Sequence, residues 1–257
     1  MKNKKNLIIG YGRLGQRIHI QNEKNIDWVT IRKHAKEPLA SFNQDILSID
    51  LEVLGDLDTI IFCMAPDEYS ESAYSYCYLQ SLNYVLKYTS FKKIIFCSSS
   101  GVYHQNNGEI VDELSITNPS HFSGKILLEA EKLIQEVAPS SYILRLSGLY
   151  DGSRSPPSSW KNFSTWTNRI HLEDATNIIS ILLNKDLNNH STFCITDDLP
   201  FIPKEIASLF YLNDNPLFRS DRIISSKKVL NSRIKKYLNY EFFYPTIFEG
   251  YKNYLRG

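Results

Sequence analysis

A glycine-rich turn near the start of the chain restricts the possible folds more than any other feature. Gly10, Gly12 and Gly15 follow the apolar run 7–9 and precede a helical pattern over 13–21. A strand, a tight turn and a helix in this order predict the opening of a βαβ unit. The first glycine permits the turn, the second leaves the backbone open to a phosphate, and the third lets helix and strand pack closely. We therefore expect a parallel α/β sheet with an anion site at this turn, supported by the helix N-terminus.

Short apolar runs alternate with helical patterns over the first 150 residues. Strands are predicted at 7–9, 28–31, 44–49, 59–64, 93–97 and 141–146, and helices at 13–21, 70–87 and 125–137. This alternation predicts an α/β fold with a doubly wound parallel sheet. Beyond a Ser/Pro/Trp-rich loop at 151–167, we expect a helix at 174–183, a strand at 192–195, a helix at 203–209 and a basic C-terminal helix plus loop.

Composition excludes several classes of protein. The 257 residues include 29 Lys+Arg and 28 Asp+Glu, a balance that argues against a nucleic-acid-binding protein. The charge is uneven, with +7 over 1–36, −12 over 37–218 and +6 over 219–257. Basic ends indicate an anion site, mutual packing of the ends, or solvated charged faces. No run approaches 18 apolar residues, so no membrane span is expected, and four cysteines without a zinc-type spacing favour the cytoplasm.

The turn fits a dinucleotide-binding fingerprint, but the residues beyond it depart from the NAD pattern. That pattern places Asp or Glu about 20 residues on, bonded to the ribose 2′-hydroxyl. Here the second strand ends at Arg32, which with Arg13 could pair with a 2′-phosphate and so favours NADP, with NAD possible. Arg32 could instead be an ordinary exposed strand-end residue. Asp45 could accept a hydrogen bond from the adenine amine, and we add Leu14 and Ala65 to the predicted cofactor contacts.

Four further motifs follow the glycine turn in order. They are S-S-x-x-V-Y at 98–103, K-x-x-x-E at 125–129, R-x-x-G-x-Y at 145–150 and I-H-x-x-D at 170–174. In these motifs the chain resembles the extended, NAD-dependent epimerase/dehydratase-like branch of the short-chain dehydrogenase/reductase superfamily, and its tail over 227–250 resembles the YeeZ-like group. The resemblance implies a Rossmann dinucleotide-binding domain over 1–150 and a small α+β substrate cap over 151–257, of which parts of 168–195 could rejoin the sheet. It also implies a possible homodimer.

The same resemblance implies a catalytic Ser or Thr, Tyr and Lys, with the Tyr four residues before the Lys. Ser99 would orient a substrate oxygen, and Lys125 would bind the nicotinamide ribose, but His121 stands where the tyrosine is expected. Imidazole can transfer a proton near neutral pH. Beside the charge of Lys125 we expect its neutral form, which is a weaker acid. His121 could therefore be a poor acid, a hydrogen-bond donor or a surface residue, and Tyr103 and Tyr150 are alternative donors that are more often structural.

Two functions are consistent with these residues. The first is an NADP-dependent oxidoreductase or epimerase-like enzyme acting on a small carbonyl or hydroxyl substrate. The second is an inactive NADP-binding sensor or scaffold, whose basic segment at 225–236 could contact an acidic partner or form a solvated face. We expect Arg145 to bond carbonyls at the end of the sheet, the motif at 170–174 to form a structural hinge, and the acidic pair at 112–113 to form a solvated turn.

Overall fold

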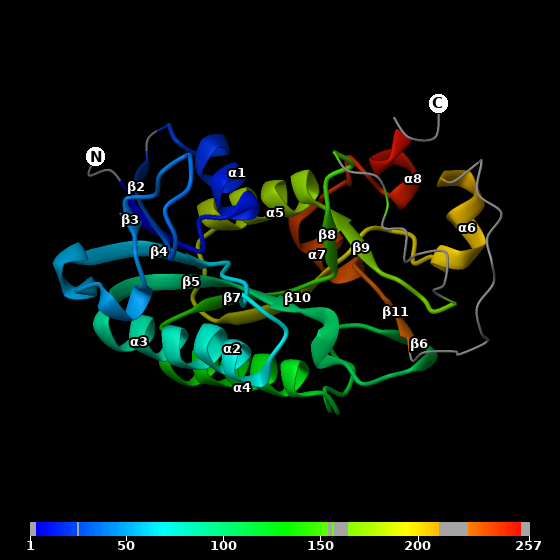
Figure 1. Ribbon diagram of the computed structural model, residues 1–257, viewed down its shortest axis with the longest axis horizontal. Helices are drawn as coiled ribbons and strands as arrows, with labels where there is room; N and C mark the ends of the chain where they lie inside the picture. Colours follow the sequence, from blue (N-terminus) through cyan, green and yellow to red (C-terminus); the bar gives the residue numbers. More distant parts are fainter. Residues whose placement is uncertain (1–3, 25, 154–155, 157–163, 211–225, 253–257) are drawn as a thin grey trace. The chain divides into compact units, whose positions relative to one another are not determined.

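Figure 1 shows the computed structural model, which describes all residues except 1–3, 25, 154–155, 157–163, 211–225 and 253–257. The chain forms two compact units that interleave along the sequence. The first unit comprises Met1–Val102, Thr117–Arg145 and Thr176–Thr192; the second comprises Tyr103–Ile116, Leu146–Ala175 and Phe193–Gly257. The domain boundary at residue 150 remains a prediction.

A seven-stranded sheet carries the predicted doubly wound topology. Its order is β10-β7-β5-β4-β1-β2-β3. The strands are β1 (Lys4–Ile9), β2 (Ile26–Arg32), β3 (Phe42–Asn43), β4 (Asp56–Phe62), β5 (Ser90–Ser99), β7 (Ser141–Leu146) and β10 (His190–Ile195). β1 pairs in parallel with β2 on one side and with β4 on the other. The chain therefore reverses its direction across the sheet between β1 and β4, which is where doubly wound sheets bind ligands.

Helices lie on both faces of this sheet (Figure 1), and all of their residues except the first four of α5 belong to the first unit. On one face are α1 (Arg13–Gln21) and α5 (Leu172–Asn184); on the other are α2 (Glu71–Ser75), α3 (Ser81–Tyr88) and α4 (Phe122–Val137). A π-helical turn, η3 (Tyr76–Gln80), joins α2 to α3. Because both faces are covered, the central strands contain short apolar runs, in which Ile60, Ile61, Ile94 and Ile95 are fully buried.

The predicted strand at 44–49 is wrong. β3 ends at Asn43, and two short 3₁₀ helices follow, η1 (Ile46–Ser48) and η2 (Leu51–Leu54). The side chain of Asp45 caps η1 by accepting a hydrogen bond from the Leu47 amide at 3.0 Å. Such local side-chain bonds favour a turn over a strand, which explains the difference.

The second unit contains two small parallel sheets that the sequence did not predict. β6 (Asn107–Val111) pairs with β11 (Ser226–Val229), and β8 (Gly148–Tyr150) pairs with β9 (Arg169–His171). Among the described residues of this unit, the helices α6 (Pro203–Phe210), α7 (Ser232–Leu238) and α8 (Ile247–Gly250) accompany them. Tyr150, Phe201, Ile247 and Tyr251 form a buried apolar cluster. Among the described helices of the whole chain, none has the length and apolar character needed to cross a bilayer.

Candidate cofactor and catalytic site

The glycine turn after β1 closes against the ends of both neighbouring strands. The amides of Gly10 and Tyr11 donate to the carbonyl of Ile31 at 3.1 and 3.0 Å. Gly10 has a φ of +100°, and a Cβ atom there would lie 2.6 Å from the backbone of Cys63 and Met64 beyond β4. Only glycine fits this position, because both the backbone conformation and the space exclude a side chain.

The other two glycines of the turn differ in what surrounds them. A Cβ on Gly15 would lie 2.6 Å from the carbonyl oxygen of Gly10, whereas a Cβ on Gly12 would meet no atom nearer than 4.0 Å. Gly12 begins α1 without a side-chain cap, and no acidic residue lies in the first turn. Arg13 is exposed there and Leu14 is buried. Open space beside Gly12, next to the positive end of a helix, fits the pyrophosphate of a dinucleotide.

Arg32 lies at the end of β2, the strand adjacent to the turn. Its Nη1 donates to the carbonyls of Lys36 at 2.8 Å and Pro38 at 3.4 Å, and its guanidinium lies 5.7 Å from the Tyr11 ring centroid. The side chain therefore orders the loop after β2 and retains further donors for an anion.

Asp45 and Ala65 lie beyond β3 and β4. The Asp45 carboxylate accepts hydrogen bonds from the Leu47 amide and from the hydroxyl of Tyr76. Burial, followed by this bond to the Asp45 carboxylate, raises the pKa of Tyr76. Asp45 thus already has two donors, and a contact with adenine would be additional. Ala65 is exposed just beyond the strand end.

His121 occupies the N-cap position of α4. Its Nδ1 accepts a hydrogen bond from the Ser123 amide at 3.5 Å. Lys125 lies one turn along the helix, and its amide donates to the His121 carbonyl at 3.1 Å. Both side chains are exposed. His121 therefore has a structural role in the helix start, which the sequence did not reveal.

Ser99 ends β5 and leads into the 3₁₀ turn η4 (Ser100–Val102). Its Oγ accepts a hydrogen bond from the Gly101 amide at 3.1 Å. A Cβ on Gly124 would lie 2.5 Å from the Gly101 carbonyl oxygen, so the missing side chain lets the η4 turn pack directly on the first turn of α4. This contact brings the predicted serine, histidine and lysine to one region of the first unit.

Tyr69, in the loop between β4 and α2, also belongs to this region and was missed in the sequence. Its hydroxyl lies 3.1 Å from His121 Nδ1 and 3.4 Å from Ser123 Oγ. Its ring stacks on the imidazole with centroids 5.4 Å apart and packs on Phe122 and Tyr74. No motif marks this residue; the concentration of tyrosines over 69–78 is the signal that could have found it.

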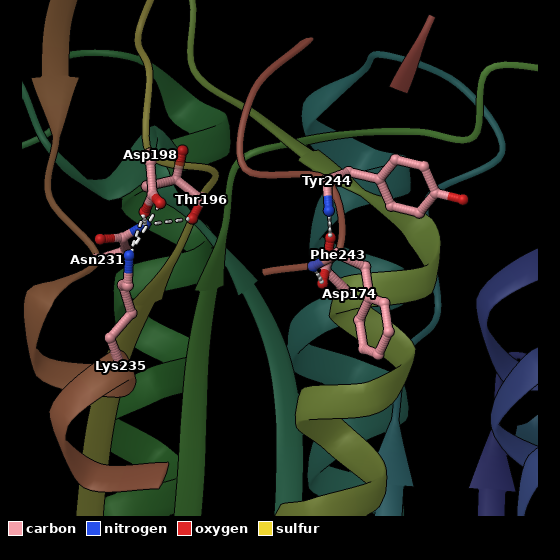
Figure 2. Close-up of polar contacts among 7 residues, drawn as sticks. All are labelled: Asp174, Thr196, Asp198, Asn231, Lys235, Phe243 and Tyr244. Atoms are coloured by element: carbon pink, nitrogen blue, oxygen red, sulfur yellow. Dashed lines mark hydrogen bonds and ion pairs between the residues drawn. The ribbon is translucent and has the colours of Figure 1, made fainter. Parts of the chain in front are cut away.

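In the second unit, Asp174 of the I-H-x-x-D motif anchors the C-terminal segment. Its carboxylate accepts hydrogen bonds from the Phe243 and Tyr244 amides, both at 2.9 Å (Figure 2). It also accepts one from the Tyr240 hydroxyl at 2.7 Å. His171 packs its ring on Tyr244 with centroids 3.6 Å apart. These contacts give both motif residues a structural role.

Tail residues of the second unit serve as anchors too. The Asn231 side-chain amide donates to the Thr196 carbonyl at 3.0 Å and to Asp198 at 2.7 Å, and Lys235 pairs with Asp198 at 2.8 Å (Figure 2). Lys228 lies over the Trp166 ring, 4.0 Å from its centroid. Part of the basic tail is therefore engaged in contacts within this unit; Ser225, at the start of the predicted basic segment, lies outside the described residues.

The two alternative tyrosine donors make internal hydrogen bonds. The Tyr103 hydroxyl lies 3.1 Å from the Cys194 sulfur, and the Tyr150 hydroxyl donates to the Thr246 carbonyl at 3.3 Å. Burial raises the pKa of Tyr150, which makes it a poorer proton donor near neutral pH. Lys227 donates to the Tyr103 carbonyl at 3.0 Å.

The structure adds a partner to one sequence interpretation, for Arg145, and corrects another, for Glu113. Arg145 binds the carboxylate of Glu131, with Nη2 to Oε2 at 2.7 Å, in addition to any carbonyl contact. Ser98 donates to the same carboxylate at 2.5 Å, so Glu131 is a buried ionic centre that the sequence did not identify. Glu113, expected in a solvated turn, accepts a hydrogen bond from the Cys194 amide at 2.7 Å.

Comparison with known proteins finds solved structures that share this architecture. No family profile and no curated protein matches the sequence. Among solved structures, a putative NAD-dependent epimerase/dehydratase from Methylobacillus flagellatus is 26% identical, with a TM-score of 0.79 over 99% of this chain and 98% of that one. MoeE5 in complex with UDP-glucuronic acid and NAD is 15% identical, with a TM-score of 0.81 over 98% of each chain.

A mutant of UDP-glucuronic acid 4-epimerase from Bacillus cereus, in complex with a UDP-sugar analogue and NAD, is 17% identical, with a TM-score of 0.79 over 98% of each chain. These likenesses extend over nearly the whole chain. The chain therefore has the fold of the solved NAD-dependent epimerase/dehydratase and short-chain dehydrogenase/reductase proteins.

Proposed function

We propose that this protein binds a nicotinamide dinucleotide, preferentially NADP, and acts as an oxidoreductase or epimerase-like enzyme on a small carbonyl or hydroxyl substrate. The observation that carries the proposal is the contrast within the glycine turn. Gly10 and Gly15 are required by the packing of the protein itself, but the space beside Gly12 is open. A glycine that the protein does not need for its own packing, at the start of an uncapped helix, fits a bound pyrophosphate.

The remaining cofactor contacts follow from the positions of the strand ends. Gly10, Gly12, Arg13, Leu14 and Gly15 would surround the pyrophosphate. Arg32, on the strand next to the turn, would pair with the 2′-phosphate of NADP. Its hydrogen bonds to the carbonyls of Lys36 and Pro38 hold the guanidinium against the loop after β2. Asp45 would border the adenine, and Ala65 would contact the dinucleotide beyond the end of β4.

The catalytic groups would act together at the start of α4. When bound, the cofactor supplies or accepts the hydride. Ser99 would donate a hydrogen bond to the substrate oxygen, and Lys125 would bind the nicotinamide ribose. His121 stands in the position of the usual tyrosine; its Nδ1 accepts a hydrogen bond from the Ser123 amide and lies 3.1 Å from the hydroxyl oxygens of Tyr69 and Ser123.

The substrate class follows only in outline. Structural neighbours are complexes with UDP-glucose or UDP-glucuronic acid and NAD, which makes these nucleotide sugars suitable first probes. Residues 151–257 would form the substrate cap. A homodimer and a cytoplasmic location remain predictions from the sequence.

Thermal unfolding with added ligand tests the proposal. NADPH and NADH at 1 mM, or about 100 times a Kd of 10 µM, should each raise the midpoint, and NADPH should raise it more. UDP-glucose and UDP-glucuronic acid are then added to the cofactor-loaded protein. The absence of any shift with either dinucleotide would reject the proposed function.

The second function, an inactive NADP-binding sensor, is favoured by one observation. Ser99 Oγ and His121 Nδ1 both accept backbone hydrogen bonds that a purely structural role would explain. Replacing His121→Tyr separates the two functions. If only the acid is missing, this variant should gain NADPH-dependent reduction of carbonyl probes; a variant that binds NADPH and stays inactive would favour the sensor.

A further inference from the structure

The phenol missing at position 121 has a counterpart in space. The Tyr69 hydroxyl lies 3.1 Å from Nδ1 of His121, the residue that replaces the expected tyrosine. The same hydroxyl lies 3.4 Å from Ser123 Oγ, in the first turn of α4. A phenol is thus present at the helix start where the superfamily chemistry needs one, although it comes from another segment of the chain.

Aromatic neighbours fix the orientation of this exposed side chain. Tyr69 is 67% exposed, yet its ring stacks on the His121 imidazole with an interplanar angle of 19°. The Phe122 ring lies 5.2 Å from it and the Tyr74 ring 5.6 Å, and these two rings also pack on each other. Such contacts restrict the rotation of a ring that an ordinary loop tyrosine would keep free.

Neighbouring charges of the same loop are already paired. Asp67 forms an ion pair with Lys33 at 2.8 Å, and Glu68 accepts a hydrogen bond from the Ser70 hydroxyl at 2.7 Å. Lys125 lies one turn beyond His121 on α4 and is exposed. The charged side chains of this loop thus have partners of their own, and the Tyr69 hydroxyl contacts His121 and Ser123 instead.

We propose that Tyr69 is the acid–base residue of this site and that His121 is a positioning residue, which holds the phenol oxygen through its contact with Nδ1. The inference rests on the proposed function. In the oxidative direction, the carbinol C–H bond breaks and its hydride passes to the bound oxidised nicotinamide. The substrate O–H proton passes to the Tyr69 phenolate, a carbonyl forms, and the phenol later releases its proton to water. Reduction runs these steps in reverse.

A tyrosinate titration tests this assignment without a known substrate. Absorbance at 295 nm is followed from pH 7 to 11 for the full chain and for Tyr69→Phe, and the difference reports Tyr69 alone. Each protein is titrated free, with NADP⁺ and with NADPH. If Tyr69 faces the nicotinamide, the positive ring of NADP⁺ should lower the Tyr69 midpoint by about one pH unit relative to NADPH, since a charge about 6 Å away at intermediate dielectric has this effect.

Control variants separate the possible failures. Tyr84→Phe removes a phenol that donates to the Ile49 carbonyl at 2.9 Å and should leave the NADP⁺-dependent difference intact. His121→Asn retains an acceptor and a helix cap and should keep the difference, whereas His121→Ala should reduce it by at least half. Equal differences in these two variants would overturn the positioning role of His121.

Failure of the Tyr69 assignment can be distinguished from failure of the proposed function. If NADP⁺ stabilises the protein thermally but the Tyr69 midpoint is the same with NADP⁺ and NADPH, the assignment of Tyr69 is overturned and the proposed function stands. If neither dinucleotide stabilises the protein, the proposed function fails and the inference fails with it.

Discussion

Alanine at two glycines of the turn should separate folding from cofactor binding. Gly12 has φ −90° and ψ −159°, which alanine adopts without strain, and a Cβ there meets nothing nearer than 4.0 Å. Gly12→Ala should therefore change the free energy of unfolding by no more than about 1 kcal/mol, the usual effect of alanine at an N-cap. At Gly15 the new Cβ would lie 2.6 Å from the Gly10 carbonyl oxygen, and overpacking of this kind costs about 1–3 kcal/mol.

The effect of Gly12→Ala on dinucleotide binding should be large, in contrast to its small effect on the free energy of unfolding. A dinucleotide at about 100 times its Kd stabilises the native state by about 2.7 kcal/mol. With an unfolding entropy of ~2.1 cal/mol/K per residue, this corresponds to a rise of ~5 °C in Tm for a chain of this length. In Gly12→Ala the methyl group would occupy the place of the pyrophosphate, so the rise should fall below ~1 °C.

Differential scanning fluorimetry with and without NADPH measures both quantities. The wild type should gain ~5 °C, Gly12→Ala should keep the unliganded Tm and lose the gain, and Gly15→Ala should lower the unliganded Tm. A Gly12→Ala protein that retains the full NADPH shift would refute the placement of the pyrophosphate beside this residue.

Three further predictions concern specificity and stability. Arg32→Ala should weaken the binding of NADPH by at least tenfold and change the binding of NADH little. Calorimetric titration measures both affinities, and equal losses of affinity would contradict the pairing of Arg32 with the 2′-phosphate. Burial raises the pKa of Asp197 to about 8, so the native state retains a proton that the unfolded state loses above pH ~4. Stability should therefore fall between pH ~4 and 8 by up to ~1.4 kcal/mol per pH unit, and Asp197→Asn should flatten this slope in urea unfolding; an unchanged slope contradicts the assignment. Glu131→Ala leaves Arg145 without its 2.7 Å partner and should cost ~3–5 kcal/mol of unfolding free energy, and a loss below ~1 kcal/mol would show that the pair contributes little.

Local patterns in the sequence predict most of the first unit. The helix at Arg13–Gln21 and the strand at Ser141–Leu146 have the predicted bounds, since the glycine turn and a mainly apolar run after Pro139 leave few alternatives. The segment at 44–49 deviates because the Asp45 side chain bonds its own backbone two residues on. The hydrophobic periodicity of a segment does not predict a hydrogen bond of this kind between a side chain and the backbone.

Contacts between distant segments could not be predicted in the same way. β6 and β11 pair across more than 100 residues, and neither strand is long or strongly apolar. The contact between Tyr69 and His121 likewise joins a loop to a helix 52 positions away. The family motifs predicted Ser99, His121 and Lys125 near one another, but only the structure adds a phenol to this group.

A crystal structure of the protein soaked with NADPH tests the central claim most directly. The account predicts the pyrophosphate over Gly12 at the start of α1, the 2′-phosphate beside Arg32 and the nicotinamide near Ser99, Lys125 and Tyr69. Density for the dinucleotide away from the glycine turn, or none at saturating concentration, would contradict it.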